Sequence, residues 1–403
     1  DPHITKSILR PDNFDQLNNS IKMFLNHENF NFESGIQSYE NLQIINQSDR
    51  YQYILPYYNF ERSIKQNYFN GNINFNSNGS NNLDNTNNLK TNITNNLDYN
   101  SLDYVSNWGL KSNYGVNLQN LNSIGKKVSQ YKSSPQIELA GLFSANVSFP
   151  LSKNVEEYTN LLTPKLSFRF NPSDMKDYST SENKIDVNNI FALNRLGLSD
   201  TLETGKSMTL GLDFVKEKKN DLNEINNYFE IKLATVLRDK EQKFIPNKSS
   251  LHRKSSNLFG SITNKFSDNL DLGYNFSIDN DYNTFQHNDL NATISVNNFV
   301  TTFNFIKEKS DTGDTNVIKN TIAYNFNDKN SFKFETRRNR EINLTEYYDL
   351  VYEYKNDCLT AGIKYKKNYY SDGDLKPTEN LLFTITLFPL TTYEYSANEI
   401  IQN

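Results

Sequence analysis

The chain has 403 residues, 42 lysine and arginine residues against 47 aspartate and glutamate residues, and a formal net charge of −5. This mild acidity argues against a nucleic-acid binder, which needs a basic face. Hydrophobic residues are 36% of the chain, the mean hydropathy is −0.73, and no run approaches the roughly 20 apolar residues of a membrane-spanning helix. A membrane protein of this composition must therefore span with strands, in which only every second residue faces lipid.

Apolar and polar residues alternate along most of the chain, which indicates strands with one apolar and one polar face. In the clearest example, Ile137, Leu139, Phe143 and Val147 share one parity. Comparable stripes occupy residues 108–118, 162–170, 208–214, 229–237, 270–278, 290–296, 299–305, 318–326, 348–354, 359–365 and 381–387. The stripes are about ten residues long, as in tilted strands that cross a bilayer. A soluble sandwich also alternates, but its strands are usually about five to six residues long.

The connections between these stripes alternate between short turns and long polar stretches. Residues 297–298 and 327–330 form tight breaks, whereas 279–288 and 308–316 are longer and polar. Short turns at one end and long loops at the other are typical of an outer-membrane barrel. We therefore predict an all-β fold, an antiparallel transmembrane β-barrel with about 18 strands, in one domain over residues 1–403.

The longest irregular stretch, residues 171–206, is predicted on the long-loop side, with a short helix or folded loop at 190–193. Loops of this length are usually functional or disordered. The four histidines, His3, His27, His252 and His287, are dispersed and lack metal-ligand spacing. Ser250 and His252 are not supported by a nucleophile elbow. We therefore expect no catalytic residue, no metal and no cofactor.

Five segments resemble, in the same order, the LptD family of lipopolysaccharide-assembly outer-membrane proteins (OstA/Imp). The strongest resemblance is in residues 347–365 (YYDLVYEYKNDCLTAGIKY), similar to the penultimate hairpin, and 380–387 (NLLFTITL), similar to the closing strand. Residues 162–170 (LTPKLSFRF) resemble a mid-barrel strand, 190–200 (IFALNRLGLSD) a family loop, and 54–56 an early strand. The chain is accordingly similar to the C-terminal barrel part of that family, without a recognisable N-terminal periplasmic jellyroll domain or first barrel strands.

The resemblance implies transport in the outer membrane of a Gram-negative bacterium, with no enzyme activity. Lipopolysaccharide would arrive along an LptA-like periplasmic bridge that contacts the missing N-terminal domain. Its sugars would pass through the lumen, beside an LptE-like lipoprotein plug, and leave by a lateral seam into the outer leaflet among outer-membrane lipids. No nucleic-acid partner is expected. The alternative function is a general outer-membrane porin or solute channel, in which the strands close alone around a water-filled pore.

The resemblance also implies roles for particular residues. It places the lateral seam on the last strand, at Leu381, Phe383, Ile385, Leu387 and Pro389. Proline cannot donate to a strand ladder, so Pro389 either weakens pairing at the seam or, more simply, ends the strand.

Two further roles follow from the same resemblance. The single cysteine, Cys358, would form an interdomain disulfide with a cysteine outside this chain; otherwise it is a free thiol in a turn. Asn194, Arg195 and Asp200 match a family loop motif and would brace the long loop inside the lumen through charge-assisted hydrogen bonds. The alternative is that these three residues are solvated loop residues.

Overall fold

The computed structural model describes residues 16–41, 50–65, 70–84, 87–128, 131–155, 157–219, 225–267, 269–309, 314–369, 378–387 and 391–397. In these residues, 22 strands form a single sheet, and a 3-10 helix, η2, spans Asn247–Ser249. None of the described helical segments is long and apolar enough to cross a membrane.

The strands follow one another along the chain. The first eight are β1 (Gln16–His27), β2 (Phe30–Asn41), β3 (Tyr51–Ile64), β4 (Gly71–Asp84), β5 (Asn88–Ser101), β6 (Tyr104–Val105), β7 (Lys111–Lys126) and β8 (Gln136–Ser148). The next seven are β9 (Leu151–Val155), β10 (Tyr158–Asn171), β11 (Gly205–Lys219), β12 (Ile225–Arg238), β13 (Leu258–Ser267), β14 (Leu270–Ile278) and β15 (Phe285–Val296). The last seven are β16 (Phe299–Glu308), β17 (Thr315–Asn327), β18 (Asn330–Asn339), β19 (Leu344–Lys355), β20 (Leu359–Asn368), β21 (Thr378–Leu387) and β22 (Thr391–Ser396).

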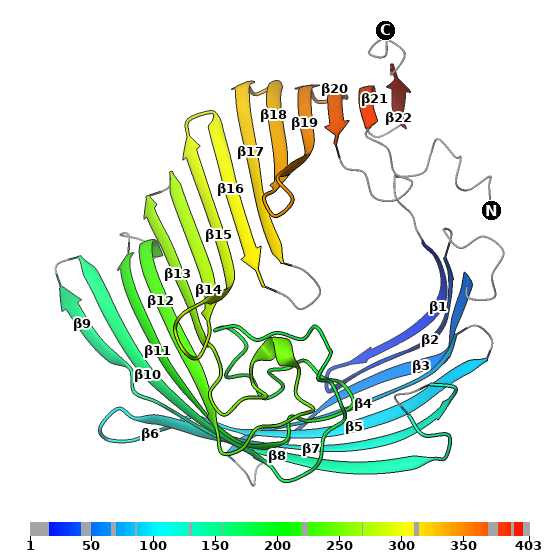
Figure 1. Ribbon diagram of the computed structural model, residues 1–403, viewed down its shortest axis with the longest axis vertical. Helices are drawn as coiled ribbons and strands as arrows, with labels where there is room; N and C mark the ends of the chain where they lie inside the picture. The colour runs from blue at the N-terminus through cyan, green and yellow to red at the C-terminus, as the bar shows by residue number, and fades with distance from the viewer. Residues whose placement is uncertain are drawn as a thin grey trace.

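All the pairings are antiparallel, and most join strands that are consecutive in the chain. The exceptions are short pieces that share a partner with the strand before them. Strands β5 and β6 both pair with β7, and β8 and β9 both pair with β10, so β6 continues β5 and β9 continues β8. The sheet is therefore an up-and-down meander that curves into a wall (Figure 1).

The predicted fold class is confirmed, whereas the predicted count of about 18 strands is too low. Three of the strands that the count misses are short: β6 has 2 residues, β9 has 5 and β22 has 6. Alternation over so few residues is too weak to identify a strand from the sequence. The asparagine-rich first quarter adds to the error, since β4 and β5 carry polar residues in both parities.

Burial along the strands is the reverse of that in a soluble protein. On β10, the apolar Leu166 and Phe168 are 38% and 42% exposed, whereas the intervening Ser167 and Arg169 are 1% and 2% exposed. Strand β11 repeats the pattern, with Met208 exposed and Thr209 buried. The apolar parity therefore faces outward, towards lipid, and the polar parity faces the interior of the wall.

The connections differ in length at the two ends of the wall. Residues 172–204, between β10 and β11, and residues 239–257, between β12 and β13, are long, whereas residues 297–298 and 356–358 are tight turns at the other end. The two long connections fold back and lie inside the wall (Figure 1, green). They are called the internal loops below.

Candidate functional site

The internal loops have a hydrophobic core of their own, built against the inner face of β12 and β13. Ile190, Ile245 and Leu251 are fully buried in it. The other members are Met175, Ile185, Val187, Leu196, Leu198, Ala234, Val236 and Phe259. Burying each large aliphatic side chain contributes roughly 1.5–3 kcal/mol. The loops are thus packed against the wall like a small domain, rather than lying loosely in a channel.

Arg195 and Glu203 form the polar centre of the first internal loop. The Nε and Nη2 atoms of Arg195 donate to the two carboxylate oxygens of Glu203, at 2.7 and 2.6 Å. Arg195 also donates to Thr209 Oγ1 and Ser207 Oγ of β11, each at 2.9 Å. Arg238, at the end of β12, pairs with the same carboxylate. These hydrogen bonds tie the loop to two neighbouring strands of the wall.

The ionisation of Glu203 depends on these two guanidinium groups. Burial alone would raise the pKa of the Glu203 carboxyl, but the charges and hydrogen bonds of Arg195 and Arg238 outweigh it. The pKa of Glu203 therefore lies well below its ordinary value, and the carboxylate stays ionised although its side chain is only 5% exposed. A buried charge of this kind is stable only while its partners remain in place.

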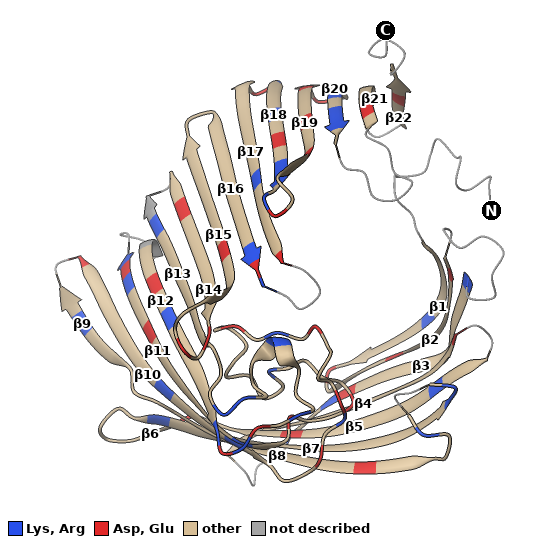
Figure 2. Ribbon diagram, in the orientation of Figure 1, with Lys and Arg blue, Asp and Glu red and all other residues tan. Residues whose placement is uncertain are grey.

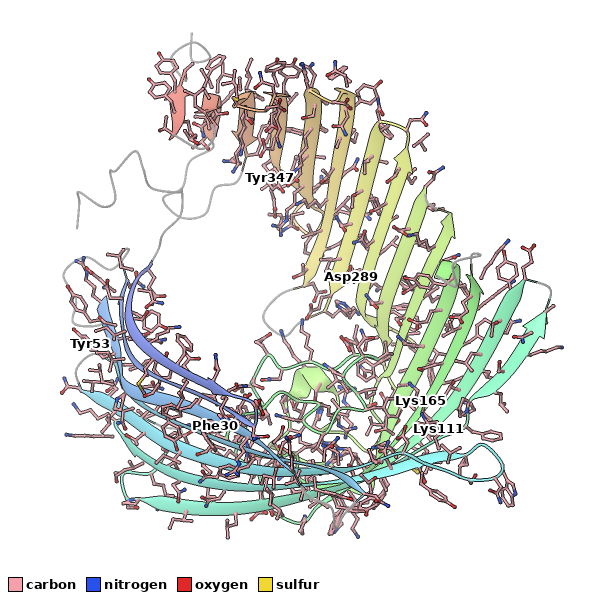
Figure 3. All side chains as sticks on the ribbon, turned by 180° about the vertical axis from the view of Figure 1, so that it is seen from behind. Phe30, Tyr53, Lys111, Lys165, Asp289 and Tyr347 are labelled. Carbon is pink, nitrogen blue, oxygen red and sulfur yellow. The ribbon has the colours of Figure 1, made fainter. Side chains whose placement is uncertain are left out.

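A third arginine, Arg169 of β10, also reaches the loop from the wall. Its guanidinium donates to the backbone oxygens of Ala192, at 2.6 Å, and of Leu193. Next to it, Phe191 lies under the Nζ atom of Lys165, which is 5.6 Å from the ring centroid (Lys165 is labelled in Figure 3). The turn at 190–193 is thus held from below by two cationic side chains of one strand.

Asp200 anchors the far end of the same loop. It accepts hydrogen bonds from the hydroxyl groups of Tyr131, at 2.9 Å, and Tyr178, and lies 3.5 Å from Lys176 Nζ. Burial, with a further contribution from Asp200, raises the pKa of Tyr131, so this phenol stays protonated and donates. Asn194 shapes the chain between these anchors: its side chain donates to Leu198 O at 2.7 Å and accepts from Leu198 N at 3.2 Å.

The structure therefore places Asn194, Arg195 and Asp200 in one loop but in three separate contacts. Sequence reasoning missed their main partners, Glu203 and Tyr131, which carry no spacing signal. Arg169 could have been noticed, because it is a long cation on the inward parity of a strand whose inward neighbour is the small Ser167. No group of described residues has the composition and geometry of a metal site.

The inner face of the opposite part of the wall, β17–β20, carries charged side chains, and no described loop covers it. Lys319 and Lys333 lie 2.9 and 3.4 Å from Glu335, and Lys364 lies 3.4 Å from Asp349. The three lysine side chains are 39–53% exposed. Figure 2 shows charged positions along β17–β20, across the interior from the internal loops. This part of the wall presents a polar, charged surface to the interior of the wall.

A cavity of about 780 Å³ lies between the internal loops and the inner face of β13–β16. Its wall side includes Ser277, His287 and Glu308, and Asp289, labelled in Figure 3, lies in the same region. Its loop side includes His252 and residues 184–188. One ion pair crosses it, between Lys184 Nζ and Glu308 Oε1 at 2.5 Å.

The predicted seam strand lies one position away from the edge of the sheet. Leu381, Phe383, Ile385 and Leu387 share one face of β21, but β21 pairs with β20 on one side and with β22 on the other. The prediction that residues 380–387 form the closing strand is therefore wrong, because β22 follows β21 and pairs with it. Pro389 lies outside the described residues. No described pairing joins β22 to β1, so these two strands are the sheet's described edges (Figure 1).

Cys358 lies in the tight turn between β19 and β20, where its thiol is exposed and free within the described chain. Its backbone N–H donates to Asn356 Oδ1 at 3.0 Å, which fixes the turn. The turn belongs to the end of the wall with short connections. A disulfide from this position would have to reach a cysteine of another segment or chain.

Comparisons with known proteins give one family match and several distant structural likenesses. The model of LptD, described as LPS transport system D, matches residues 10–330. It thus includes the resembling segments at 54–56, 162–170 and 190–200, and stops before those at 347–365 and 380–387. No curated protein sequence matches the chain.

The solved structures that are similar share little sequence. A mutant of the ferric enterobactin receptor PfeA from Pseudomonas aeruginosa is 9% identical, with a TM-score of 0.42, over 96% of this chain and 73% of that one. The FrpB iron transporter from Neisseria meningitidis is 8% identical, with a TM-score of 0.36, over 96% and 77%. The copper transporter OprC is 7% identical, with a TM-score of 0.36, over 94% and 72%.

Proposed function

Because the chain belongs to the LptD family and serves lipopolysaccharide transport in the outer membrane of a Gram-negative bacterium, we propose that lipopolysaccharide sugars pass through its lumen and leave sideways into the outer leaflet. The family match over residues 10–330 is the observation that carries this proposal. The role is transport and assembly rather than catalysis. The chain contributes a shaped polar path, and the energy comes from elsewhere.

The division of the wall into two faces supports such a path. Outward stripes such as Leu166 and Phe168 suit acyl chains, whereas inward residues such as Lys319 and Glu335 suit sugars and phosphates. Lipopolysaccharide carries both acyl chains and sugars. It could keep its acyl chains in lipid and its sugars inside the wall only if the wall opens between two strands. We place that opening between β1 and β22, in place of the predicted seam at β21.

The internal loops are proposed to narrow the lumen on one side. The hydrogen bonds of Asn194, Arg195 and Asp200 support a bracing role for these residues. The charged inner face of β17–β20 has no described loop over it, and its lysines are partly exposed. This face is where an LptE-like lipoprotein plug would fit, with sugars moving past it.

Two further partnerships follow from the family alone. An LptA-like periplasmic bridge would deliver lipopolysaccharide by way of an N-terminal domain beyond this chain. Cys358 would hold that domain by a disulfide, since its exposed position in a short turn leaves the thiol accessible.

Site-specific photocrosslinking in cells tests the lumen path. A benzophenone amino acid at Thr321, which faces inward, is compared with one at the adjacent Ile322, which faces outward. We expect Thr321 to form adducts attached through the sugars, identified by mass spectrometry. We expect Ile322 to form adducts only through acyl chains. Sugar adducts from both positions, or from neither, would contradict the proposal.

Conductance measurements distinguish the porin alternative from the transport proposal. A general porin would give large, steady ionic currents when the chain alone is placed in a planar bilayer. The packed internal loops lead us to expect low conductance, which would rise when these loops are removed. High conductance of the intact chain, together with an absence of lipopolysaccharide adducts, would favour the porin.

A further inference from the structure

A groove of about 510 Å³ lies on the outer, lipid-facing surface of the wall, across β4, β5, β7 and β8. Its outward-facing lining is apolar at Phe75, Leu97, Leu118 and Leu139 and polar at Asn95 and Asn120. Strand register puts Gly141 at the end of the row formed by Phe75, Leu97 and Leu118. Around a Cβ added at Gly141, the nearest atom is Leu118 Cδ2, at 3.4 Å, so the missing side chain leaves an open hollow.

Polar side chains form one side of the groove, although they stand on the outward parity. Asn95 Nδ2 and Asn122 Nδ2 both donate to Asn120 Oδ1, at 3.1 and 2.7 Å. Ser77 Oγ donates to Asn95 Oδ1 at 2.7 Å, and the hydroxyl groups of Tyr58 and Ser77 are 3.1 Å apart. These five residues come from four neighbouring strands, and they are called the polar ladder below.

The polar ladder lies on the long-loop side of the apolar band. Strand β7 is antiparallel to β8, and β8 to β10, so β7 runs, like β10, towards the end of the wall that carries the internal loops. On β7, the outward Val116 and Leu118 come before Asn120 and Asn122. The apolar stripe at 108–118 already has the length of a segment that crosses a bilayer. Since long loops are extracellular in outer-membrane barrels, the ladder is level with the head groups of the outer leaflet, and the groove with its acyl chains.

The polar ladder gives the groove a means of selecting a lipid. Any acyl chain could lie on the apolar floor, where Leu118 is 51% and Leu139 is 75% exposed. An amide nitrogen carries two hydrogens, and the described hydrogen bonds use one on Asn95 and one on Asn122. The second N–H of each can donate to a head group. No lysine or arginine is among the described residues that line the groove, so its donors are neutral and suit sugar oxygens better than a phosphate, for which cations are preferred.

We propose that this groove is a docking site for one lipopolysaccharide molecule of the outer leaflet, with an acyl chain over Gly141 and sugar groups on the polar ladder. The groove is continuous with the outward stripes that face lipid, which favours a membrane lipid over a protein as its occupant. This inference rests on the proposed function, in which the chain delivers lipopolysaccharide to that leaflet. The occupant would be a molecule that has already reached the leaflet, because the groove is on the outer face and not in the lumen.

Lipid-selective crosslinking tests the site. The whole chain is placed in vesicles of phosphatidylcholine that contain a small, known fraction of lipopolysaccharide. A benzophenone amino acid is introduced at Ile137, which is outward beside the groove and 76% exposed, or at Phe303, which is outward on β16. Mass spectrometry gives the ratio of lipopolysaccharide to phosphatidylcholine adducts. At Ile137 this ratio should exceed that of the vesicle by about fivefold, as expected for one net hydrogen bond. At Phe303 it should equal that of the vesicle.

Variants that carry the probe at Ile137 locate the bound lipid. Gly141→Leu fills the hollow, and Asn120→Leu removes the centre of the polar ladder with little change in side-chain size. Each should return the adduct ratio to that of the vesicle. Ala292→Leu, on the outward parity of β15, also enlarges a small lipid-facing residue and should leave the enrichment unchanged. Retarded migration of unheated samples in gels confirms that each variant is folded.

Three outcomes would overturn the site. Equal ratios at Ile137 and Phe303 would mean that the groove is ordinary lipid-facing surface. Enrichment that survives both Gly141→Leu and Asn120→Leu would mean that the lipid is held elsewhere, and enrichment of phosphatidylcholine would mean a phospholipid groove. Each result could occur while Thr321 still forms sugar adducts in cells, so failure of the site is distinguishable from failure of the transport path. If Thr321 gives no sugar adducts while the enrichment persists, the transport path fails and the docking site stands.

Discussion

Two parts of the wall share one alternating pattern but have very different inner faces. On β10–β13, the inward residues are often small, such as Ser167, Thr209 and Ser261, and the internal loops bury them. On β17–β20, the inward residues include long charged side chains such as Lys319 and Glu335, which stay partly exposed. The outer faces of both parts are apolar. The residue types on the outer face suit contact with lipid, whereas those on the inner face depend on what packs against them inside the wall.

The size of the inward residues explains where the loops can pack. A close-packed interface needs small residues under the loop and a few long ones that reach into it. Gly211 lies directly beneath the ring of Phe191, where an added Cβ would come within 2.5 Å of it. Arg169 is one of the long residues, since its guanidinium reaches the backbone of the loop. On β17–β20, lysine, arginine and glutamate side chains would keep a loop away from the wall, and no described loop covers that surface.

The sharpest test of this contrast removes one carboxylate from each part. Glu203→Ala should lower the free energy of unfolding by about 3–5 kcal/mol, because it leaves Arg195 and Arg238 buried without a counter-charge. Glu335→Ala should lower it by at most about 1 kcal/mol, since Lys319 and Lys333 remain hydrated. Urea unfolding in detergent micelles, followed by circular dichroism of the strands, measures the free energy of unfolding of both variants. Equal losses would mean that the two parts do not differ as described.

Acid should loosen the internal loops before it affects the strands. The pKa of Glu203 is depressed in the folded chain, so its contribution is complete above the ordinary glutamate pKa of about 4.3 and is lost as the pH falls towards the depressed value. We therefore expect the loops to resist an acid-tolerant protease such as pepsin at pH 5. Below about pH 4 they should become progressively susceptible. Cleavage in 172–204 that is equally fast at pH 5 and pH 3, relative to cleavage of an unfolded substrate by the same protease at each pH, would contradict the linkage.

The sequence predicted the wall better than it predicted the lumen. Outward stripes are visible because lipid imposes a strict period of two, as in residues 318–326. The loop motif at Asn194, Arg195 and Asp200 lies in a segment that packs inside the wall, while its bracing role stays a prediction. Its partners could not be predicted, since Glu203, Tyr131 and the wall residues meet only after the sheet has curved. The edge was misplaced for a related reason: β22 is a six-residue strand that only its pairing with β21 reveals.

The smallest and most local test compares two glycines on the inner face. Gly211→Ala places a methyl group against Phe191, which must move away from β11, and we expect a loss of about 1–3 kcal/mol, as for overpacking. Gly273→Ala, on β14, meets no atom within 4 Å and should be neutral or slightly stabilising, because alanine restricts the unfolded chain. Urea midpoints of the two variants measure the difference. A Gly273→Ala variant that is as unstable as Gly211→Ala would show that something also packs on β14, and the division of the wall would then have to shift towards β15.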